Sequence, residues 1–289
     1  MLNASSTPPR KVFGSTGRKV VPVGQGSWKT EESSEAAAIA SLRRGLDLGL
    51  THIDTAEMYG AGASERIIGT AVNGRRDQVF LVSKVLPSNA SRQGTIAACE
   101  KSLARLKTDR LDCYLLHWRG RFSLEDTIAA FEQLKRDGKI LSWGVSNFDV
   151  DDLEEVAALA GPGHPACNQV LYHLQERAIE HAVLPWCIEH GTALVAYTPF
   201  GTSPAPFDAR TRPGQLLHDI AKHHQSSARA VALQFLLRHP NSFVIPKAAS
   251  LPHVSDNAAA IALQLTQDDI EKIDAAFPRG KAPRTLPTI

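Results

Sequence analysis

The sequence predicts an α/β fold, a single (β/α)8 TIM barrel with an N-terminal β-hairpin and extra C-terminal helices. Short apolar runs alternate with amphipathic stretches of helical length, which is typical of parallel strands joined by helical crossovers. Eight such units fit into 289 residues, the size of one such barrel. No linker or shift in composition divides the chain. We therefore expect one domain over residues 1–289, with residues 1–10 flexible and residues 278–289 forming a C-terminal tail.

The elements follow in order along the chain. Short runs at residues 11–13 and 19–21 around a Gly-rich turn indicate the hairpin. The strands are expected at residues 23–26, 51–54, 79–84, 111–117, 140–147, 166–170, 193–197 and 243–245. Helical patterns lie at residues 36–49, 64–72, 94–106, 124–136, 150–159, 214–224 and 227–238, and near Pro252. Ser123 with Asp126 is typical of a helix start, and Gly138 of the following helix end.

The composition excludes several classes of protein. Hydrophobic residues make up 43% and charged residues 21%, which is typical of a globular chain rather than a disordered one. A net charge of +2 argues against a nucleic-acid partner. No apolar run is long enough for a membrane span, and the N-terminus lacks the pattern of a secretory signal. The cysteines at positions 99, 113, 167 and 187 lack metal-binding spacing, so we expect reduced thiols, no metal site and a cytoplasmic location.

Polar residues end seven of the eight expected strands. The chemistry of such barrels lies at the carboxyl ends of the strands. A strand-end polar residue can also be structural, since it can cap a helix or bind loop backbone. Seven of them on one rim nevertheless indicate a site. They are Asp54, Lys84, His117, Ser146 with Asn147, Gln169, Tyr197 and Lys247.

Four side chains near this rim suit the donation of a proton to a carbonyl oxygen. Tyr59 follows Asp54 by five residues, but a free tyrosine has a pKa of ~10 and is a poor acid at neutral pH. An ammonium such as that of Lys84 lowers this pKa, and the Asp54 carboxylate holds the ammonium in place. His117, on the next strand, can bind and orient the same carbonyl oxygen. A separate agent would deliver the hydride.

These residues stand in segments that resemble the aldo-keto reductase superfamily. Asp54, Tyr59, Lys84 and His117 resemble the family's catalytic tetrad, in the settings Ile-Asp-Thr-Ala-x-x-Tyr-Gly, Val-Ser-Lys and Leu-Leu-His-Trp. Segments at residues 143–148, 168–169, 196–199 and 245–247 also match in order, and the similarity runs from about residue 13 to residue 257. Within the family the chain is most similar to bacterial reductases of small aldehydes and dicarbonyls, the methylglyoxal reductase type.

The resemblance implies NADPH-dependent reduction of small aldehydes and ketones, such as methylglyoxal-like dicarbonyls, to alcohols. Hydride would come from C4 of the nicotinamide and the proton from Tyr59. Ser146, Asn147 and Gln169 would bind the carboxamide, and the Tyr197 ring would stack on the nicotinamide. The implied cofactor-binding residues are Gly26, Ser27, Trp28, Asp54, Ser146, Asn147, Gln169, Tyr197, Thr198, Pro199, Phe200, Gly201, Ile245, Lys247, Ala248, His253, Asp256 and Asn257. The implied substrate-binding residues are Trp28, Met58, Tyr59, His117 and Trp118.

The cofactor segment departs from the family pattern after Lys247. Ala248 stands where a Ser or Thr is usual, and His253 where an Arg is usual. Asp256 and Asn257 fill the places of a Glu-Asn pair near the adenine. A histidine is largely neutral at pH 7, so we expect NADPH to remain preferred but with a weaker preference over NADH. The loop at residues 161–166 contains two prolines and follows a helix, so it is not a dinucleotide-binding fingerprint.

Several alternatives accompany this interpretation. Trp28 and Trp118 can pack under loops instead of lining a substrate mouth. Arg119 and Arg121 can attract acidic substrates, but we expect them to be solvated loop charges. The short tail favours a shallow pocket. A non-catalytic, cofactor-sensing regulatory subunit on the same fold is the alternative function. The expected assembly is a monomer or a weak homo-oligomer, with a small carbonyl substrate and no membrane partner.

Overall fold

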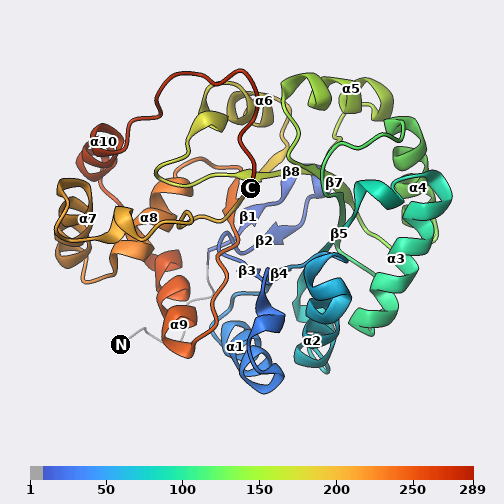
Figure 1. Ribbon diagram of the computed structural model, residues 1–289, viewed down its shortest axis with the longest axis horizontal. Coiled ribbons are helices and arrows are strands. Elements are labelled where there is room, and N and C mark those ends of the chain that lie inside the picture. Colours follow the sequence, from blue (N-terminus) through green and yellow to red (C-terminus); the bar gives the residue numbers. More distant parts are fainter. Residues whose placement is uncertain (1–8) are drawn as a thin grey trace.

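The computed structural model describes residues 9–289, so residues 1–8 of the expected flexible N-terminus lie outside the described part. A ring of helices surrounds a central sheet of eight parallel strands (Figure 1). Each strand pairs with the next one in the sequence. The strands are β3 (Gln25–Gly26), β4 (His52–Asp54), β5 (Phe80–Val85), β6 (Cys113–Leu116), β7 (Trp143–Ser146), β8 (Cys167–Leu171), β9 (Ala193–Tyr197) and β10 (Ser242–Val244).

The first and last strands meet and close the barrel. Parallel bridges join Val23 to Val244 and Gly26 to Lys247. The Gly26 amide donates to the Pro246 carbonyl at 3.1 Å. A Cβ at Gly26 would lie 2.5 Å from the Ile245 carbonyl oxygen, so a side chain there would separate the two segments. These contacts agree with the predicted (β/α)8 barrel.

The helices on the outer face match most of the predicted ones. Ser34 and Ser123 cap α1 and α4, and Gly49 and Gly138 take positive φ angles just beyond their ends. The sequence patterns did not locate α6 or α10; α6 is short and contains Pro185, which the first turn of a helix tolerates. The helices are α1 (Glu35–Asp47), α2 (Ala63–Ala71), α3 (Arg92–Leu106), α4 (Leu124–Arg136), α5 (Val150–Ala160), α6 (Val183–Glu189), α7 (Arg212–His223), α8 (Ala228–Leu236), α9 (Leu251–Ala259) and α10 (Gln267–Ala276).

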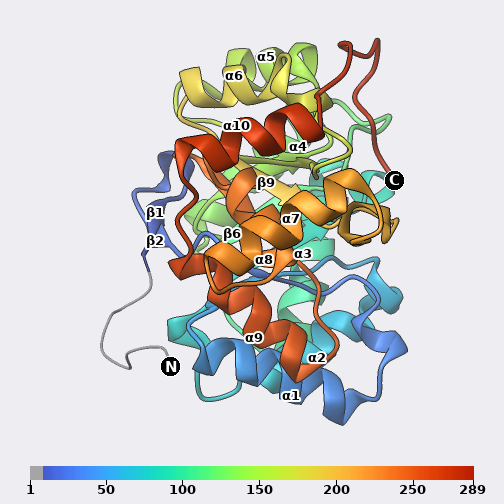
Figure 2. The same cartoon turned by 90° about the vertical axis from the view of Figure 1, so that its left-hand side faces the viewer.

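The expected hairpin closes one end of the barrel. It consists of β1 (Lys11–Val12) and β2 (Lys19–Val20), which pair antiparallel. Phe13 is fully buried and packs inside the barrel on Phe80 and Phe243, with ring centroids 4.7 and 4.9 Å away. Figure 2 shows the hairpin and the C-terminal end of the chain at opposite ends of the barrel. No helix within residues 9–289 combines the length and the apolar character needed to cross a membrane.

Candidate active site

The loop after β4 carries Tyr59 and is fixed to its neighbours. The Tyr59 amide donates to the Ala56 carbonyl at 3.1 Å and begins a short turn. The Glu57 carboxylate accepts from the Leu86 amide at 2.7 Å and from the Asn89 side chain at 2.9 Å. The loop after β4 is therefore tied to the loop after β5. This contact gives the Tyr59 ring a defined position above the barrel.

Lys84 connects Tyr59 to Asp54. Strands β4 and β5 pair with Asp54 opposite Val82. Because alternate residues of a strand face the same side, Lys84 enters the barrel just above this level. Its fully buried ammonium donates to Asp54 Oδ1 at 2.5 Å, to the Thr55 carbonyl at 2.8 Å and to the Tyr59 hydroxyl at 3.4 Å. The predicted Asp, Tyr and Lys therefore lie in one hydrogen-bonded group.

Burial changes the ionisation of this group more than the sequence suggested. Burial raises the pKa of Asp54, which the Lys84 charge and hydrogen bonds only partly oppose. Burial also raises the pKa of Tyr59 above its usual value, although the Lys84 ammonium acts to lower it. The expected lowering effect of Lys84 on the Tyr59 pKa is therefore present, but the effect of burial is larger. The Asp54 and Tyr59 charges outweigh the burial of Lys84 and raise its pKa, which keeps the ammonium charged.

His117 lies beside Tyr59 as a neutral ring. The two ring centroids are 5.8 Å apart in an edge-to-face arrangement. Burial and the nearby Lys84 charge lower the pKa of His117 to about 2. Its Nδ1 atom is buried and meets no hydrogen-bond partner within residues 9–289. A neutral imidazole carries one N–H donor, so His117 is able to donate to a carbonyl oxygen over a wide pH range.

The opposite wall consists of the polar ends of β7, β8 and β9. The Tyr197 hydroxyl donates to Asn147 Oδ1 at 2.8 Å, and the Asn147 amide group donates to the His117 carbonyl at 3.2 Å. The Ser146 hydroxyl donates to the Gln169 carbonyl at 2.9 Å. Gln169 Nε2 in turn donates to Asp54 Oδ2 at 2.7 Å. Burial raises the pKa of Tyr197 to about 12, so its hydroxyl remains a donor.

These side chains enclose a cavity of about 600 Å³ at the carboxyl ends of the strands. Lys84 lies beneath it. Trp28, Met58 and Trp118 are 45%, 41% and 38% exposed on its rim rather than packed under loops. The predicted residues that line it are Gly26, Ser27, Trp28, Asp54, Met58, Tyr59, His117, Trp118, Ser146, Asn147, Gln169, Tyr197, Thr198, Pro199, Phe200, Gly201, Ile245 and Lys247.

Four further residues line this cavity that the sequence analysis did not single out. Lys29, Glu32 and Thr202 follow the predicted residues in the loops after β3 and β9, so extending each strand-end loop would have found them. Ile289 belongs to the C-terminal tail, which returns from α10 to the centre of the barrel mouth (Figure 1). No strand or helix pattern signals that return. The tail therefore adds a wall to a pocket that we expected to be shallow.

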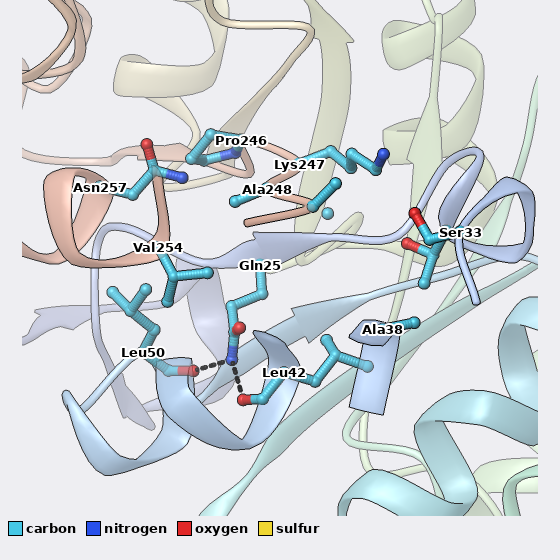
Figure 3. Close-up of a pocket in the computed structure, with 13 residues that line it drawn as sticks. Gln25, Ser33, Ala38, Leu42, Leu50, Pro246, Lys247, Ala248, Val254 and Asn257 are labelled. Carbon is cyan, nitrogen blue, oxygen red and sulfur yellow. Dashed lines mark hydrogen bonds between the residues drawn. The ribbon is translucent and has the colours of Figure 1, made fainter. Parts of the chain in front are cut away.

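A smaller cavity with a mainly apolar lining lies beside Lys247, between α1 and α9 (Figure 3). Ala248 and Asn257 line it, as does Gln25, whose amide donates to the Leu50 carbonyl at 2.9 Å. Gln25 was not singled out in the sequence because it stands within a strand. His253 and Asp256 lie on α9 and line neither of these two cavities. Four of the predicted cofactor residues, at positions 248, 253, 256 and 257, are therefore outside the main cavity.

Other candidate features have structural roles. Arg119 pairs with Glu155 at 2.8 Å and with Asp152 at 3.3 Å, which leaves its charge engaged. All four cysteines are buried and free. Across residues 9–289, no group of three or more His, Cys, Asp or Glu side chains is placed to hold a metal ion.

The chain is similar to known reductases in sequence and in structure. The sequence profile of the aldo/keto reductase family matches residues 22–277. Methylglyoxal reductase YeaE of Escherichia coli is 46% identical over 91% of this chain and 93% of its own length. Glyoxal reductase of Bacillus subtilis is 35% identical over 87% of each chain. The crystal structure of an aldo-keto reductase from Klebsiella pneumoniae in complex with NADPH superposes with a TM-score of 0.89 at 38% identity, covering 97% of this chain and 99% of that one.

The fold and the site define a barrel oxidoreductase. The chain belongs to the aldo/keto reductase family.

Proposed function

We propose that this protein reduces small aldehydes and dicarbonyls of the methylglyoxal type to alcohols, with NADPH as the reductant. One observation carries the proposal: the Tyr59 hydroxyl lies 3.4 Å from the buried Lys84 ammonium and beside neutral His117, on the wall of an open cavity. The reductases of methylglyoxal and glyoxal named above, and the NADPH complex of the Klebsiella relative, support the choice of substrate and cofactor.

The residues of the main cavity fit the nicotinamide end of a dinucleotide. A volume of about 600 Å³ lies within the usual range for small-molecule sites. The Ser146 hydroxyl and the Asn147 and Gln169 amides supply the donors and acceptors that a carboxamide needs, and the Tyr197 ring lies among them. Lys247 supplies a cation at the seam between β3 and β10, where it would bind the 2′-phosphate of NADPH. When bound, NADPH supplies the hydride.

In the proposed mechanism the side chains of the site position the carbonyl and protonate it. Tyr59 donates its hydroxyl proton to the carbonyl oxygen, and the Lys84 ammonium stabilises the phenolate that remains. The N–H of neutral His117 holds the same oxygen. Hydride addition to the carbonyl carbon and proton transfer to the oxygen together give the alcohol. Trp28, Met58 and Trp118 supply an apolar mouth for a small substrate.

Removal of the Tyr59 hydroxyl tests the proposal directly. Tyr59→Phe retains the ring but lacks the proton, so kcat for methylglyoxal should fall by roughly 10²–10⁴, while the NADPH dissociation constant from cofactor fluorescence should be unchanged. Tyr114→Phe is the matched control, because the Tyr114 hydroxyl is buried without a hydrogen-bond partner within residues 9–289. Near-normal turnover by Tyr59→Phe would refute the role of Tyr59.

A panel of aldehydes, dicarbonyls and ketones tests the substrate class. We expect kcat/KM to be highest for small dicarbonyls, because the rim combines an apolar mouth with a wall formed by the C-terminal tail. NADPH binding without turnover of any carbonyl would favour a cofactor-sensing regulatory subunit, an alternative that neither the site nor the relatives named above support.

We also propose that one domain carries this activity, as a cytoplasmic monomer or weak homo-oligomer. The four buried free thiols support a reducing compartment. Sedimentation at micromolar concentration measures the assembly.

A further inference from the structure

Gln169 joins two parts of the site that have separate tasks. It extends from β8 to Asp54 on β4, so its side chain spans strands that are not neighbours in the sheet. Its Nε2 donates to Asp54 Oδ2 at 2.7 Å, while Lys84 donates to Oδ1 of the same carboxylate at 2.5 Å. Asp54 and Gln169 are 1% and 2% exposed. Asp54 is thus held from both sides by groups on two other strands.

The chemistry of the carboxylate fixes which way the Gln169 amide faces. An ionised carboxylate only accepts hydrogen bonds, so the NH₂ group of the amide must face Asp54. The Gln169 Oε1 atom is then the free end, and no donor within residues 9–289 binds it. Gln169 lines the main cavity beside Ser146 and Asn147. An N–H donor bound there polarises the amide and strengthens its bond to Asp54.

Asp54 needs such a donor because its surroundings disfavour its charge. Burial raises its pKa, while Lys84 and the Gln169 hydrogen bond both lower it. Within residues 9–289, the titratable groups that act on Asp54, Lys84 and Tyr59 include no cation other than Lys84. They are Tyr59, neutral His117, neutral His52 beneath on β4, the Cys167 thiol on β8 and, near Tyr59, Glu31. Gln169 is therefore a neutral donor that, together with Lys84, opposes the effect of burial on the Asp54 pKa.

We propose that Gln169 is a positioning residue for the acid: its amide keeps the Asp54 carboxylate ionised against Lys84 and so links the cavity wall to the proton donor. The role in catalysis rests on the proposed function, since it acts through Tyr59. The hydrogen bond to Asp54 does not depend on that function.

Infrared titration of the protonated carboxyl band tests the inference without requiring activity, with Asp54→Asn as the blank. Gln169→Met keeps the length of the side chain but lacks the donor. It should move the midpoint of Asp54 protonation upward by about one to two pH units, as expected for one hydrogen bond to a charged group. The acid limb of the kcat profile should move by the same amount.

Asn168→Ala is the matched control on the same strand. Asn168 is a buried amide whose side chain donates to the Phe148 carbonyl at 2.9 Å and does not touch Asp54. Its loss should lower Tm but leave the Asp54 midpoint unchanged. Gln169→Leu is the second test variant, because its side chain also lacks the donor and should also raise the midpoint.

An unchanged midpoint in either folded Gln169 variant would overturn the inference. If NADPH affinity falls while the midpoint stays, Gln169 serves the cofactor alone. If neither variant folds, Gln169 is a structural residue and the inference is wrong. A wild-type protein that reduces no carbonyl would refute the proposed function, yet the infrared titration would still decide the role of Gln169.

Discussion

Replacing Lys84 with methionine removes the charge that links Asp54 to Tyr59 and keeps a similar volume. The ammonium is fully buried, and its three hydrogen bonds end on Asp54, Thr55 and Tyr59. Removing one partner of a buried ion pair typically costs about 3–5 kcal/mol. For a domain of this size we expect Tm to fall by roughly 5–15 °C.

The kinetic effect follows from the lost attraction between Lys84 and the Tyr59 phenolate. A unit charge at ~4 Å is worth about 1–4 kcal/mol near a protein surface, or about one to three pKa units. The pKa of Tyr59, already raised by burial, should therefore rise further in Lys84→Met. Tyr59 becomes a weaker acid, so kcat should fall, and the limb of the profile where Tyr59 ionises should move to higher pH.

Steady-state kcat with saturating NADPH and methylglyoxal, measured from about pH 6 to about pH 12, gives this profile. Lys11→Met is the matched control. The Lys11 ammonium is half-buried at the hairpin and donates to the Leu237 and His239 carbonyls at 2.8 Å, far from the site. The Lys11→Met variant should be less stable than the wild type but should show the same dependence of kcat on pH. A Lys84→Met protein with lower Tm and an unmoved profile would show that Lys84 only supports Asp54 structurally.

Two further predictions concern the cofactor and acid stability. His253→Arg should lower the Kd for NADPH and leave that for NADH nearly unchanged, because an arginine restores a permanent cation near the 2′-phosphate; equal weakening of both cofactors by Lys247→Ala would contradict this reading of the phosphate site. His52 is buried with both ring nitrogens unpartnered within residues 9–289, and burial with the Lys84 charge lowers its pKa to about 3. The contribution of neutral His52 to the free energy of unfolding is fully present above the unfolded pKa of ~6.5. It is lost as pH falls toward 3, by up to about 1.36 kcal/mol per pH unit. His52→Leu should flatten the acid side of the unfolding free energy from denaturant titrations, and an unaltered slope would contradict the neutral state of His52.

The strand-end residues were predictable because strand register places them. Gly26 pairs with Asp54, and Ser146 pairs with Gln169, so residues that end neighbouring strands reach the same rim. Tyr59 lies in a loop, so no strand register places it; its nearness to Asp54 in the sequence and the resemblance to a known motif indicated its role.

Three features were beyond the reach of the sequence because each depends on distances through space. The Gln169–Asp54 bond joins strands that are not neighbours in the sheet, which no local pattern records. Ile289 enters the mouth through a tail without regular structure. The net rise in the Tyr59 pKa reflects desolvation by the surrounding protein, whereas sequence reasoning weighed only the charge of Lys84.

The seam between Gly26 and Lys247 also sets an order of events during synthesis. These residues are 221 positions apart, yet their backbones form neighbouring edges of the barrel. When strands β3 to β8 have left the ribosome, the chain already contains Asp54, Tyr59, Lys84, His117 and Gln169, but the edge beside Gly26 is still open. Because domains are made from the N-terminus, the proton-donating group precedes the proposed phosphate site on the nascent chain. A dinucleotide that contacts both Gly26 and Lys247 would therefore stabilise only the completed barrel, because only there do the two segments lie side by side.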